Sequence, residues 1–384
     1  MRIAHIADTH LGYRQYNLEE RENDVYDAFN EAIEKMIEER IDVLVHAGDF
    51  FDSPRPPIKA LYVAKQGVKK LREHNIKILT VLGEHDTPRR RAMPPHPLLD
   101  LPVLGVGRVQ KVVIGDVAFF GISNLKGKRV DLLKEELSKV DILSKEHNKS
   151  VLIAHQAIKK FLPFEGAYEL EMTDLPREIS YYAFGHIHAR TIEAFGRGYL
   201  AYSGSTEIIR RSEISSWREK GKGFYIVDLE GDLPEVYTIN LESIRPQFEL
   251  SYTQEDDIVR ELRAFLYDLF NTGNPPAKAP LLRLNVQGEA LQKAEIIEKL
   301  RGILEELVPG KILRYDVHFT GTDVLTNLTP EDIKEIGGLR SLFIEYLGDE
   351  ELGTLAFELY SHLWRNDIEG SIEACNNYLR EGHE

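Results

Sequence analysis

Five short apolar runs of this chain each end in side chains that can bind a divalent metal ion. The last run, residues 181–184, has the composition of a buried strand and is followed by Gly185-His186-Ile187-His188. Gly185 allows a sharp turn, after which both imidazoles can face one small centre from adjacent directions. A lone pair of histidines at this spacing is more often part of a surface loop, so the argument for a metal site depends on the other four runs.

The other four runs end in the same kinds of side chain. Their candidate ligands are, in chain order, Asp8 and His10, Asp49, Glu84, and His155. Each of them alone would more often cap a helix or lie on the polar surface. Because the pattern repeats at five strand ends, we interpret all seven side chains as ligands of one two-metal site.

The first two runs predict how these side chains come together. Residues 2–7 and 41–47 have the composition of strands, and residues 20–40 between them place apolar side chains at helical spacing. A strand–helix–strand unit of this length predicts parallel strands whose carboxyl ends lie at one edge of a sheet. Open α/β sheets bind ligands at that edge, where we expect the candidate ligands of both runs.

Strand and helix patterns continue to about residue 240. Helices are predicted over 57–74 and 131–147, and strands over 76–82, 103–106, 111–114, 117–122, 151–154 and 223–229. The short runs between residues 103 and 122 indicate a change to antiparallel strands. The alternation of strands and helices favours the α/β class.

Composition limits the kind of protein. The length of 384 residues predicts two or three domains, and a hydrophobic fraction of 42% provides for a core. The chain begins directly with a strand pattern and contains no apolar run of ~18 residues that could span a membrane. Cys375 is the single cysteine, which rules out an internal disulfide. We therefore expect a cytoplasmic, nucleoid-associated protein with no membrane partner.

The net charge of −15 argues against a nucleic-acid partner only superficially, because its distribution is uneven. Residues 321–384 contain 14 acidic and four basic side chains, so most of the excess negative charge belongs to the C-terminal segment. Two bound divalent cations would nearly cancel the charge of the remaining chain. Nucleic acid therefore stays among the candidate substrates.

Carboxylates and imidazoles gathered at one edge suit phosphoryl chemistry. Two divalent ions ~3.5–4 Å apart can hold the attacking and leaving oxygens of an in-line displacement at phosphorus. Such a site needs one carboxylate that can bridge the ions and open positions for water and substrate. The seven candidate ligands supply this combination.

With these candidate ligands, the chain resembles the calcineurin-like metallophosphoesterases over roughly residues 1–230. The matching motifs are Asp8-x-His10, Gly48-Asp49, Gly83-Glu84-His85-Asp86, His155 and Gly185-His186-x-His188. More narrowly, residues 5–13, the segment after Asp49, residues 182–188 and residues 202–205 resemble the archaeal meiotic-recombination-eleven nucleases. These are the nuclease subunits of double-strand-break repair nuclease–ATPase complexes.

The resemblance implies a fold, an activity and partners. The fold is a two-layered sheet sandwich flanked by helices, with a small α+β capping domain and a C-terminal helical segment. The activity is exonuclease and single-strand endonuclease cleavage of DNA in double-strand break repair, with two Mn²⁺ or other divalent cations. The partners are DNA ends, single-stranded DNA, a second copy of the chain, and a chromosome-maintenance-like ATPase subunit bound through the C-terminal helices.

Roles follow from the same resemblance, position by position. One metal is assigned to Asp8, His10 and His188, and the other to His155, His186 and residue 84, with Asp49 as the bridge. His85 is a catalytic residue that helps the leaving oxygen depart and does not bind metal. At position 84 the family usually has Asn, whereas this chain has Glu84. The added carboxylate is expected to hold the second metal more tightly and to reduce its Lewis acidity.

Three domains are expected. Residues 1–240 form the nuclease domain, residues 245–320 the DNA-capping domain, and residues 328–384 the helical segment that binds the ATPase. The last segment contains two or three predicted helices whose apolar stripes can pack on this protein or on the partner. Candidate DNA-binding residues are Arg14, Arg55, Arg89 and Arg90, and candidate dimer residues are Leu61, Leu98 and Leu101.

Two other functions stay open at the level of the sequence. One is a metallophosphoesterase that acts on a small phosphodiester or a phosphoprotein. The other is a catalytically weakened scaffold, in which Glu84 has impaired the site. The capping domain and the C-terminal segment favour DNA, because a small-molecule phosphoesterase needs neither.

Overall fold

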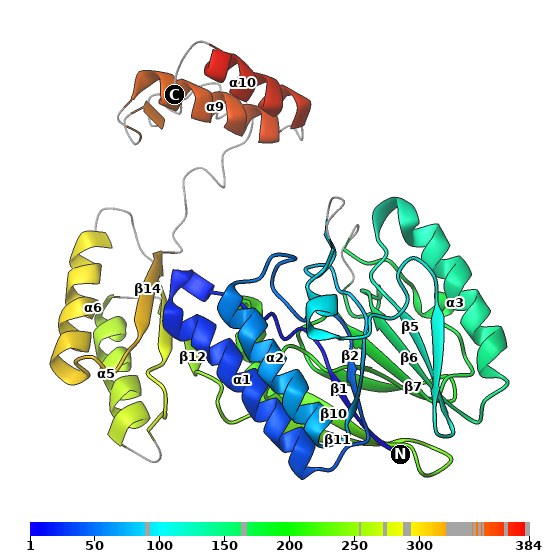
Figure 1. Cartoon of the computed structure of the whole chain (residues 1–384). Helices are drawn as coiled ribbons and strands as arrows, with labels where there is room; N and C mark the ends of the chain where they lie inside the picture. The colour runs from blue at the N-terminus through cyan, green and yellow to red at the C-terminus, as the bar shows by residue number, and fades with distance from the viewer. Residues whose placement is uncertain are drawn as a thin grey trace. The chain divides into compact units, whose positions relative to one another are not determined.

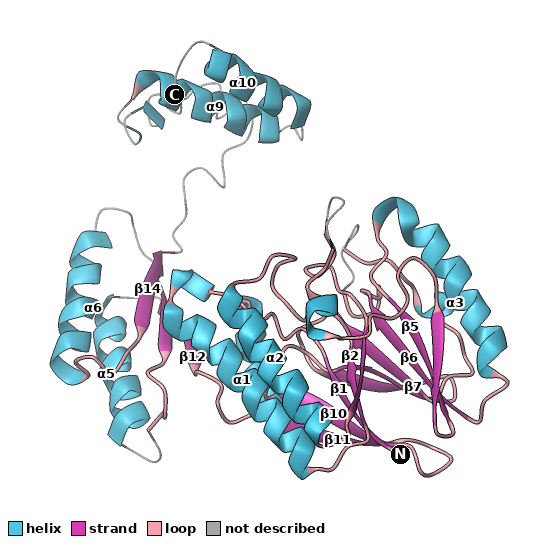
Figure 2. Cartoon of the chain, in the orientation of Figure 1, coloured by secondary structure: helices cyan, strands magenta, loops and turns pink. Residues whose placement is uncertain are grey.

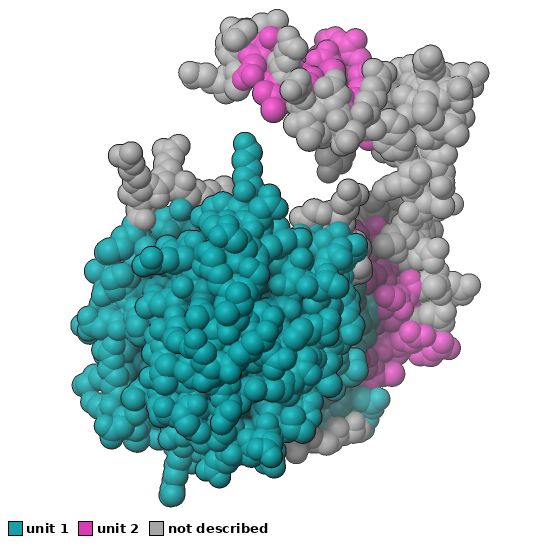
Figure 3. Space-filling view, turned by 90° about the vertical axis from the view of Figure 1, so that its right-hand side faces the viewer, with its two compact units in different colours: residues 1–250, 266–283, 308–316 teal, residues 251–265, 284–307, 317–384 magenta. Residues whose placement is uncertain are grey.

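The computed structural model of the chain forms two compact units (Figures 1 and 3). The structure describes residues 1–88, 93–162, 167–252, 255–271, 275–286, 293–319, 340, 343–344, 347, 349–364 and 368–380. The first unit contains residues 1–250, 266–283 and 308–316, and the second contains residues 251–265, 284–307 and 317–384. The predicted domain boundaries near residues 245 and 328 stay predictions.

The first sheet of unit 1 has five strands. In spatial order they are β11 (Glu235–Asn240), β10 (Gly223–Asp228), β1 (Arg2–Ile6), β2 (Val43–His46) and β3 (Lys77–Thr80). The central strands β1, β2 and β3 pair in parallel, with Ile3 opposite Val43 and Val43 opposite Lys77. Helices α1 (Glu19–Glu38) and α2 (Ile58–Glu73) connect these strands. The parallel arrangement predicted from the first two runs is therefore confirmed.

The second sheet of unit 1 has six strands. In spatial order they are β4 (Gln110–Ile114), β5 (Val117–Ile122), β6 (Lys149–His155), β7 (Tyr181–Gly185), β9 (Gly198–Tyr202) and β8 (Thr191–Phe195). Strands β5, β6, β7 and β9 are parallel, whereas β4 and β8 run antiparallel to their neighbours. Of the short runs between residues 103 and 122, only β4 and β5 form the expected antiparallel pair. Helix α3 (Val130–Ser144) connects β5 to β6 (Figure 2).

Three apolar clusters hold these layers together. One cluster lies between the two sheets and includes Val45 of β2, Phe119 of β5 and Ile153 of β6. A second joins α1 and α2 to the first sheet, and a third joins α3 to the second sheet. Strand β2 is fully buried because both faces of its sheet are covered, as is typical of parallel strands. The sandwich of two sheets flanked by helices agrees with the predicted fold class.

Five 3₁₀ helices and one short α-helix complete this region among the described residues. The 3₁₀ helices are Gln15–Asn17, His96–Leu99, Gly127–Arg129, Met172–Asp174 and Arg211–Glu213, and the α-helix is α4 (Ile214–Lys220). A three-stranded sheet follows, in the order β12 (Gln247–Tyr252), β13 (Leu281–Val286), β14 (Arg314–Phe319). Its sequence neighbours are α5 (Glu255–Asn271) and α6 (Lys293–Leu307).

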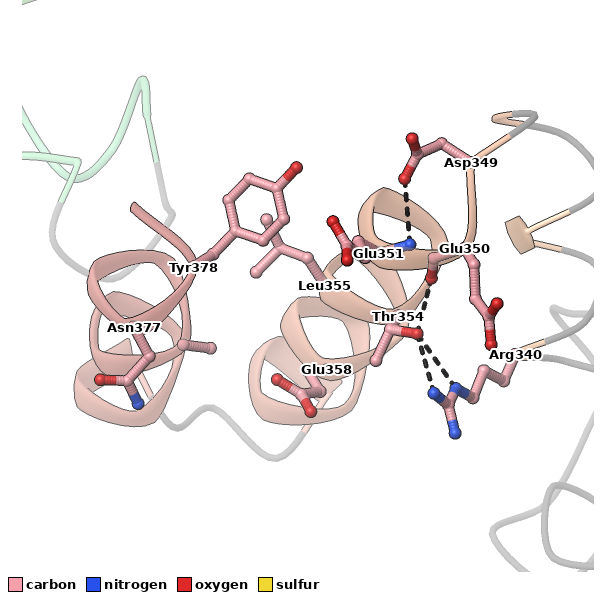
Figure 4. A pocket seen from close by; sticks show the side chains of 10 residues that line it. Arg340, Asp349, Glu350, Glu351, Thr354, Leu355, Glu358, Asn377 and Tyr378 are labelled. Atoms are coloured by element: carbon pink, nitrogen blue, oxygen red, sulfur yellow. Dashed lines mark hydrogen bonds between the residues drawn. The ribbon is translucent and has the colours of Figure 1, made fainter. Parts of the chain in front are cut away.

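Two helices are described near the C-terminus, α9 (Glu350–Trp364) and α10 (Ile368–Arg380). The Asp349 carboxylate accepts hydrogen bonds from the backbone N–H groups of Glu351 and Leu352, both at 2.9 Å, and so caps the start of α9. Figure 4 shows a pocket here, where Arg340 donates a 2.9 Å hydrogen bond to Thr354. Its other lining residues include Glu350, Glu351 and Glu358, so the pocket is acidic.

Part of the sequence prediction for the C-terminal segment lies outside the described residues. This holds for the predicted helix start at residues 329–331 and for Leu339, Leu342 and Tyr346. Within the described ranges, no helix combines the length and the apolar character needed to cross a lipid bilayer.

A buried charge network ties α1 to three later segments of unit 1. Asp24 accepts a 2.6 Å hydrogen bond from Arg21 and another of 2.6 Å from Arg245, and Lys278 lies 2.9 Å from the same carboxylate. Arg21 also bonds to Glu207 at 3.3 Å. Arg21, Asp24, Glu207 and Arg245 are almost inaccessible to solvent, so each of these charges depends on its partners. Lys278 is 22% exposed.

Replacing Asp24 by Asn should lower the free energy of unfolding by about 3–5 kcal/mol, because Arg21 and Arg245 lose their buried counter-charge. Burial alone would raise the pKa of the Asp24 carboxyl, but hydrogen bonds from Arg245 and Lys278 and the charge of Arg21 outweigh it and lower the pKa. A lowered pKa stabilises the fold above the unfolded pKa of about 4. That contribution disappears as the pH falls through the folded value.

Urea unfolding of the Asp24→Asn variant should therefore depend less on pH than that of the wild type between about pH 5 and pH 3. Asp27→Asn is the matched control, because Asp27 lies on the same helix and binds Lys278 at 2.8 Å but is 53% exposed. It should change stability by less than about 1 kcal/mol. Equal effects of the two substitutions would contradict the role of the buried network.

Candidate metal centre

The candidate ligands lie where the parallel strands of both sheets end. Asp8 and Asp49 follow β1 and β2 of the first sheet, whereas His155 and His186 lie at the ends of β6 and β7 of the second. Ligand atoms approach within 4.8 Å in three groups of side chains: Asp8, His10 and His188; Asp8, Asp49 and His155; and His10, Asp52 and His85. The sandwich thus brings together residues that are up to 180 positions apart.

Three side chains converge in the first group. The Nε2 atoms of His10 and His188 are 3.2 Å apart, and His188 Nε2 is 3.7 Å from Asp8 Oδ1. All three side chains are buried, with exposed fractions of 1%, 8% and 0%. The three atoms therefore face one position with little access for bulk water. Two nitrogens and a carboxylate oxygen are a suitable donor set for a divalent ion.

Asp49 lies between this group and His155. Its Oδ2 atom is 3.9 Å from His10 Nε2 and 3.2 Å from His155 Nε2. Its Oδ1 atom accepts a 2.7 Å hydrogen bond from the backbone N–H of His85. One oxygen is thus held by the backbone, while the other faces imidazoles on both sides. This is the position in which a carboxylate could bridge two ions.

His155 meets the requirements for a metal ligand. Its Nδ1 atom donates a 2.8 Å hydrogen bond to the backbone carbonyl of Ala47, which leaves Nε2 as the nitrogen that can bind a metal. Nε2 is buried and, among the described residues, forms no hydrogen bond of good geometry, although Asp49 Oδ2 lies 3.2 Å away. A buried polar atom without a partner is rare in native proteins, and a metal ion would satisfy this one. The residues present therefore fit a divalent cation.

The charges of the metal-free centre are arranged in pairs. Burial would raise the pKa of Asp49, but the imidazoles around it, His155 first, hold that pKa well below its usual value. Burial would lower the pKa of His155, but the carboxylates of Asp49 and Asp8 raise it to about 10. Burial raises the pKa of Asp8 to about 6. A divalent ion would replace the proton of His155 as counter-charge to the carboxylates.

The backbone is strained where it presents these ligands. Asp8, His10, Asp49 and His186 have φ values of 52°, 43°, 52° and 92°, in the left-handed region that side chains disfavour. Both Asp8 oxygens accept the backbone N–H of His186, each at 3.1 Å. Strain of this kind persists only where surrounding contacts over-determine the conformation. The left-handed backbone after β1, β2 and β7 therefore helps to place these ligands beside one another.

Two glycines let the ligand loops approach closely. A Cβ atom at Gly83 would lie 2.1 Å from Asp49 Oδ1 and 2.3 Å from the Asp49 nitrogen, and one at Gly48 would lie 2.5 Å from His155 Nδ1. The buried carboxylate of Asp86 accepts the backbone N–H groups of Phe50 at 3.0 Å and Gly83 at 3.1 Å. Asp86 therefore ties the loop after β2 to the loop after β3.

Glu84 takes a different position from the other candidate ligands. Its side chain is 36% exposed and forms an ion pair with Lys126. Like His186, it belongs to none of the three ligand groups found among the described residues. Burial would raise the pKa of Glu84, but the Lys126 ammonium lowers it. Coordination of a metal by Glu84 stays a prediction, and it would require Glu84 to separate from Lys126.

His85 lies beside the first ligand group and is accessible. Its ring centroid is 4.8 Å from that of His10, and its side chain is 35% exposed. Its Nδ1 atom hydrogen-bonds to the backbone carbonyl of Asp52 at 2.9 Å, so Nε2 is the nitrogen that can exchange a proton with a substrate. This position at the mouth of the site is compatible with contact to a substrate.

Two residues that contact the ligands were not identified from the sequence. Asp52 Oδ1 lies 3.2 Å from His10 Nδ1, and Glu213 Oε1 lies 2.7 Å from His188 Nδ1. Asp52 follows Asp49 closely, so its place in the same strand-end loop could have been noticed. Glu213 is 25 residues beyond His188 and carries no spacing signal.

The residues predicted to bind DNA or a second subunit differ in their exposure. Arg14 and Arg55 are exposed, whereas Arg89 and Arg90 lie outside the described residues. Leu98 is 67% exposed, as a residue that binds another subunit should be.

Leu101 requires a correction, whereas the dimer contact of Leu61 stays a prediction. Leu61 is partly buried against the cluster around α1 and α2, and Leu101 is a 3% exposed member of it, because the chain after the 3₁₀ helix His96–Leu99 turns inward. Leu101 is therefore not available to a second subunit. The exposed apolar side chains of α2 are Ile58, at 86%, and Tyr62, at 63%.

The chain is similar to known proteins over most of its length. The calcineurin-like phosphoesterase family model matches residues 1–190. The DNA double-strand break repair protein Mre11 of Methanocaldococcus jannaschii is 45% identical over 249 residues, which cover 63% of this chain and 67% of that protein. Proteins of the same name from Methanococcus maripaludis and Saccharolobus solfataricus are each 33% identical, over 99% and 90% of both chains, respectively.

Gly83→Ala should disrupt the centre, because the added methyl group must displace the Asp49 carboxylate or the loop that holds it. We expect a loss of about 1–3 kcal/mol in the free energy of unfolding, together with weaker Mn²⁺ binding in titration calorimetry. Gly302→Ala is the control, because a Cβ atom at Gly302 meets nothing within 4 Å. Wild-type Mn²⁺ affinity in Gly83→Ala would contradict the close packing described above.

Proposed function

Because the chain belongs to the Mre11 family of DNA double-strand break repair proteins, we propose that its centre hydrolyses DNA phosphodiester bonds with two Mn²⁺ ions. The main support for this proposal is the position of Asp49, whose Oδ2 atom faces His10 on one side and His155 on the other. A carboxylate between two sets of imidazoles suits two ions better than one. Bound ions would supply Lewis acidity at the phosphoryl oxygens and lower the pKa of a water molecule.

The ligands divide into two sets around Asp49. Asp8, His10 and His188 would hold one ion, because their ligand atoms already converge. His155 and His186 would hold the other, and their rings are 5.3 Å apart. Burial lowers the pKa of His186 to about 3, so this ring is neutral and needs no proton loss before it binds a metal. Mixed oxygen and nitrogen donors are compatible with Mn²⁺.

Glu84 would complete the second set only by exchanging Lys126 for the metal. The two states compete, because the Glu84 carboxylate pairs with the Lys126 ammonium in the structure. Charge supports the exchange, since a divalent ion attracts a carboxylate more strongly than a half-exposed ammonium does. Lys126 would then be free to contact a phosphate oxygen of the DNA.

His85 would act on the departing oxygen of the scissile bond. Its accessibility and its position beside His10 allow contact with a phosphate held at the ions, while its backbone hydrogen bond keeps the ring in place. Protonation of the leaving oxygen makes it a better leaving group. The ring binds no metal in this assignment.

His85→Gln should lower the rate of Mn²⁺-dependent DNA cleavage by about 10²–10⁴-fold, the usual contribution of a general acid. Two Mn²⁺ per chain should remain bound in elemental analysis, because the seven ligands are unchanged. His74→Gln is the matched control, since His74 is exposed at the end of α2 and should leave the rate unaffected. Loss of a metal from His85→Gln would show that the assigned role is wrong.

The same assay can compare DNA with a bis-aryl phosphodiester. A wild-type protein that cleaves the small ester in Mn²⁺ but leaves DNA intact would contradict the proposed substrate. A protein that cleaves neither would contradict the proposed activity.

The proposed partners match features of the surface. DNA would approach past the exposed side chains of Arg14 and Arg55. The C-terminal helices α9 and α10 would bind an ATPase subunit. We place the protein in the cytoplasm, at the nucleoid where its substrate is.

A second copy of the chain would bind at Ile58, Tyr62 and Leu98, which are exposed and apolar. Helix α2 and the 3₁₀ helix His96–Leu99, which carry these residues, pack together. In a two-fold dimer the same patch would contact itself.

Combined substitution of Tyr62 and Leu98 by Glu should give a folded monomer in light scattering, because charges would be buried across the two-fold axis. Ile142→Glu is the control, since Ile142 is 68% exposed on α3, which covers the other sheet. That variant should remain dimeric. An unchanged dimer mass for the double variant would contradict this location.

A further inference from the structure

A buried carboxylate that belongs to none of the candidate ligands contacts one of them directly. Glu213 ends the 3₁₀ helix Arg211–Glu213 and is 4% exposed. Its Oε1 atom accepts a 2.7 Å hydrogen bond from His188 Nδ1 and a 2.8 Å hydrogen bond from the backbone N–H of Arg210. Glu213 lies beyond residues 1–190, the part of the chain that matches the phosphoesterase family model.

The other oxygen of Glu213 is held independently. Oε2 accepts hydrogen bonds from Lys222 at 2.5 Å, from the Ser205 hydroxyl at 2.9 Å and from the backbone N–H of Ile209 at 3.2 Å. Lys222 is 3% exposed and also donates to the carbonyl of His188 at 3.0 Å. The carboxylate is therefore fixed by five donors, and its charge is balanced by a buried ammonium group.

This arrangement determines which nitrogen of His188 carries the proton. An ionised carboxylate can only accept hydrogen bonds, so His188 Nδ1 must be the donor. A neutral imidazole carries one ring proton, so a ring that donates from Nδ1 has none on Nε2. The lone pair is then on Nε2, the atom that lies 3.2 Å from His10 Nε2 and 3.7 Å from Asp8 Oδ1.

We propose that Glu213, anchored by Lys222, is the positioning residue of the metal centre that fixes the tautomer and the orientation of His188. This inference rests on the proposed role of His188 as a metal ligand. Groups that hydrogen-bond to the second nitrogen of a metal-binding histidine typically contribute about 10–100-fold to metal affinity. Glu213 touches no substrate and acts only through His188.

Comparison with two other carboxylates indicates that the role is specific. Asp52 faces His10 Nδ1 at 3.2 Å but is 30% exposed, so water can compete for its hydrogen bond. Glu207 is fully buried and lies in the same loop as Glu213, but it pairs with Arg21 and contacts none of the seven candidate ligands. Glu207 stabilises the fold, whereas Glu213 connects the fold to the centre.

Glu213→Gln should reverse the tautomer of His188. The Oε2 position faces three donors, Lys222, Ser205 and the backbone N–H of Ile209, whereas the Oε1 position faces, besides His188, only the backbone N–H of Arg210. The amide oxygen therefore takes the Oε2 position. The amide NH₂ group then faces His188 and donates to Nδ1, which moves the ring proton to Nε2. That tautomer has no lone pair directed toward His10 and Asp8.

Two measurements test the proposal. Nitrogen-15 NMR of histidine-labelled, metal-free protein reports the tautomer of His188, and calorimetric titration with MnCl₂ reports affinity. We expect the Nδ1–H tautomer in the wild type, the Nε2–H tautomer in Glu213→Gln, and a 10–100-fold weaker Mn²⁺ affinity in the variant. Glu207→Gln, the matched control, should keep the wild-type tautomer and affinity.

Three results would overturn the positioning role. The first is an Nε2–H tautomer of His188 in the wild type, a measurement that does not depend on any variant folding. The second is an unchanged tautomer in Glu213→Gln. The third is a loss of Mn²⁺ affinity in Glu207→Gln equal to that in Glu213→Gln. A wild-type protein that binds no Mn²⁺ would instead overturn the metal centre itself. The NMR comparison is made without metal and so distinguishes the two failures.

Discussion

The approach of Asp49 to His155 is the interaction on which the centre depends, because it joins the ends of strands from different sheets. Asp49 follows β2 and His155 ends β6, so their 3.2 Å separation is set by the packing of the two sheets. The 2.8 Å hydrogen bond from His155 to Ala47 crosses the same boundary. The apolar cluster between the sheets therefore controls the spacing of the ligands as well as the stability of unit 1.

Hydrogen bonds to polar groups behind the ligands fix the orientation of the ligand side chains. Three of the four candidate histidine ligands have their second nitrogen fixed: His155 by Ala47, His188 by Glu213 and His10 by Asp52. Each contact leaves Nε2 directed toward the centre. The surrounding strands and the Asp86 hydrogen bonds hold loops whose backbone would otherwise relax from the left-handed region.

Strand ends were predictable from the sequence, because apolar runs and the residues after them are local patterns. These patterns gave the parallel strands of the first sheet, the α/β class and the candidate ligands that the structure gathers. Contacts between distant segments were not predictable in this way. Lys222 reaches His188 across 34 positions, and Leu101 is buried by a turn that no local pattern indicates. The pairing of Glu84 with Lys126 likewise depends on two loops that meet only in the folded chain.

The place of β1 in its sheet affects how the protein is made. β1 is the first strand to be translated, yet it lies between β2 and β10, which leaves the ribosome much later. A nascent chain without β10 exposes one unpaired edge of β1, a surface on which other strands can aggregate. Pairing over so long a stretch of sequence is slow. Both edges of β1, the strand that precedes Asp8, are therefore paired only after the segment through β10 has been synthesised.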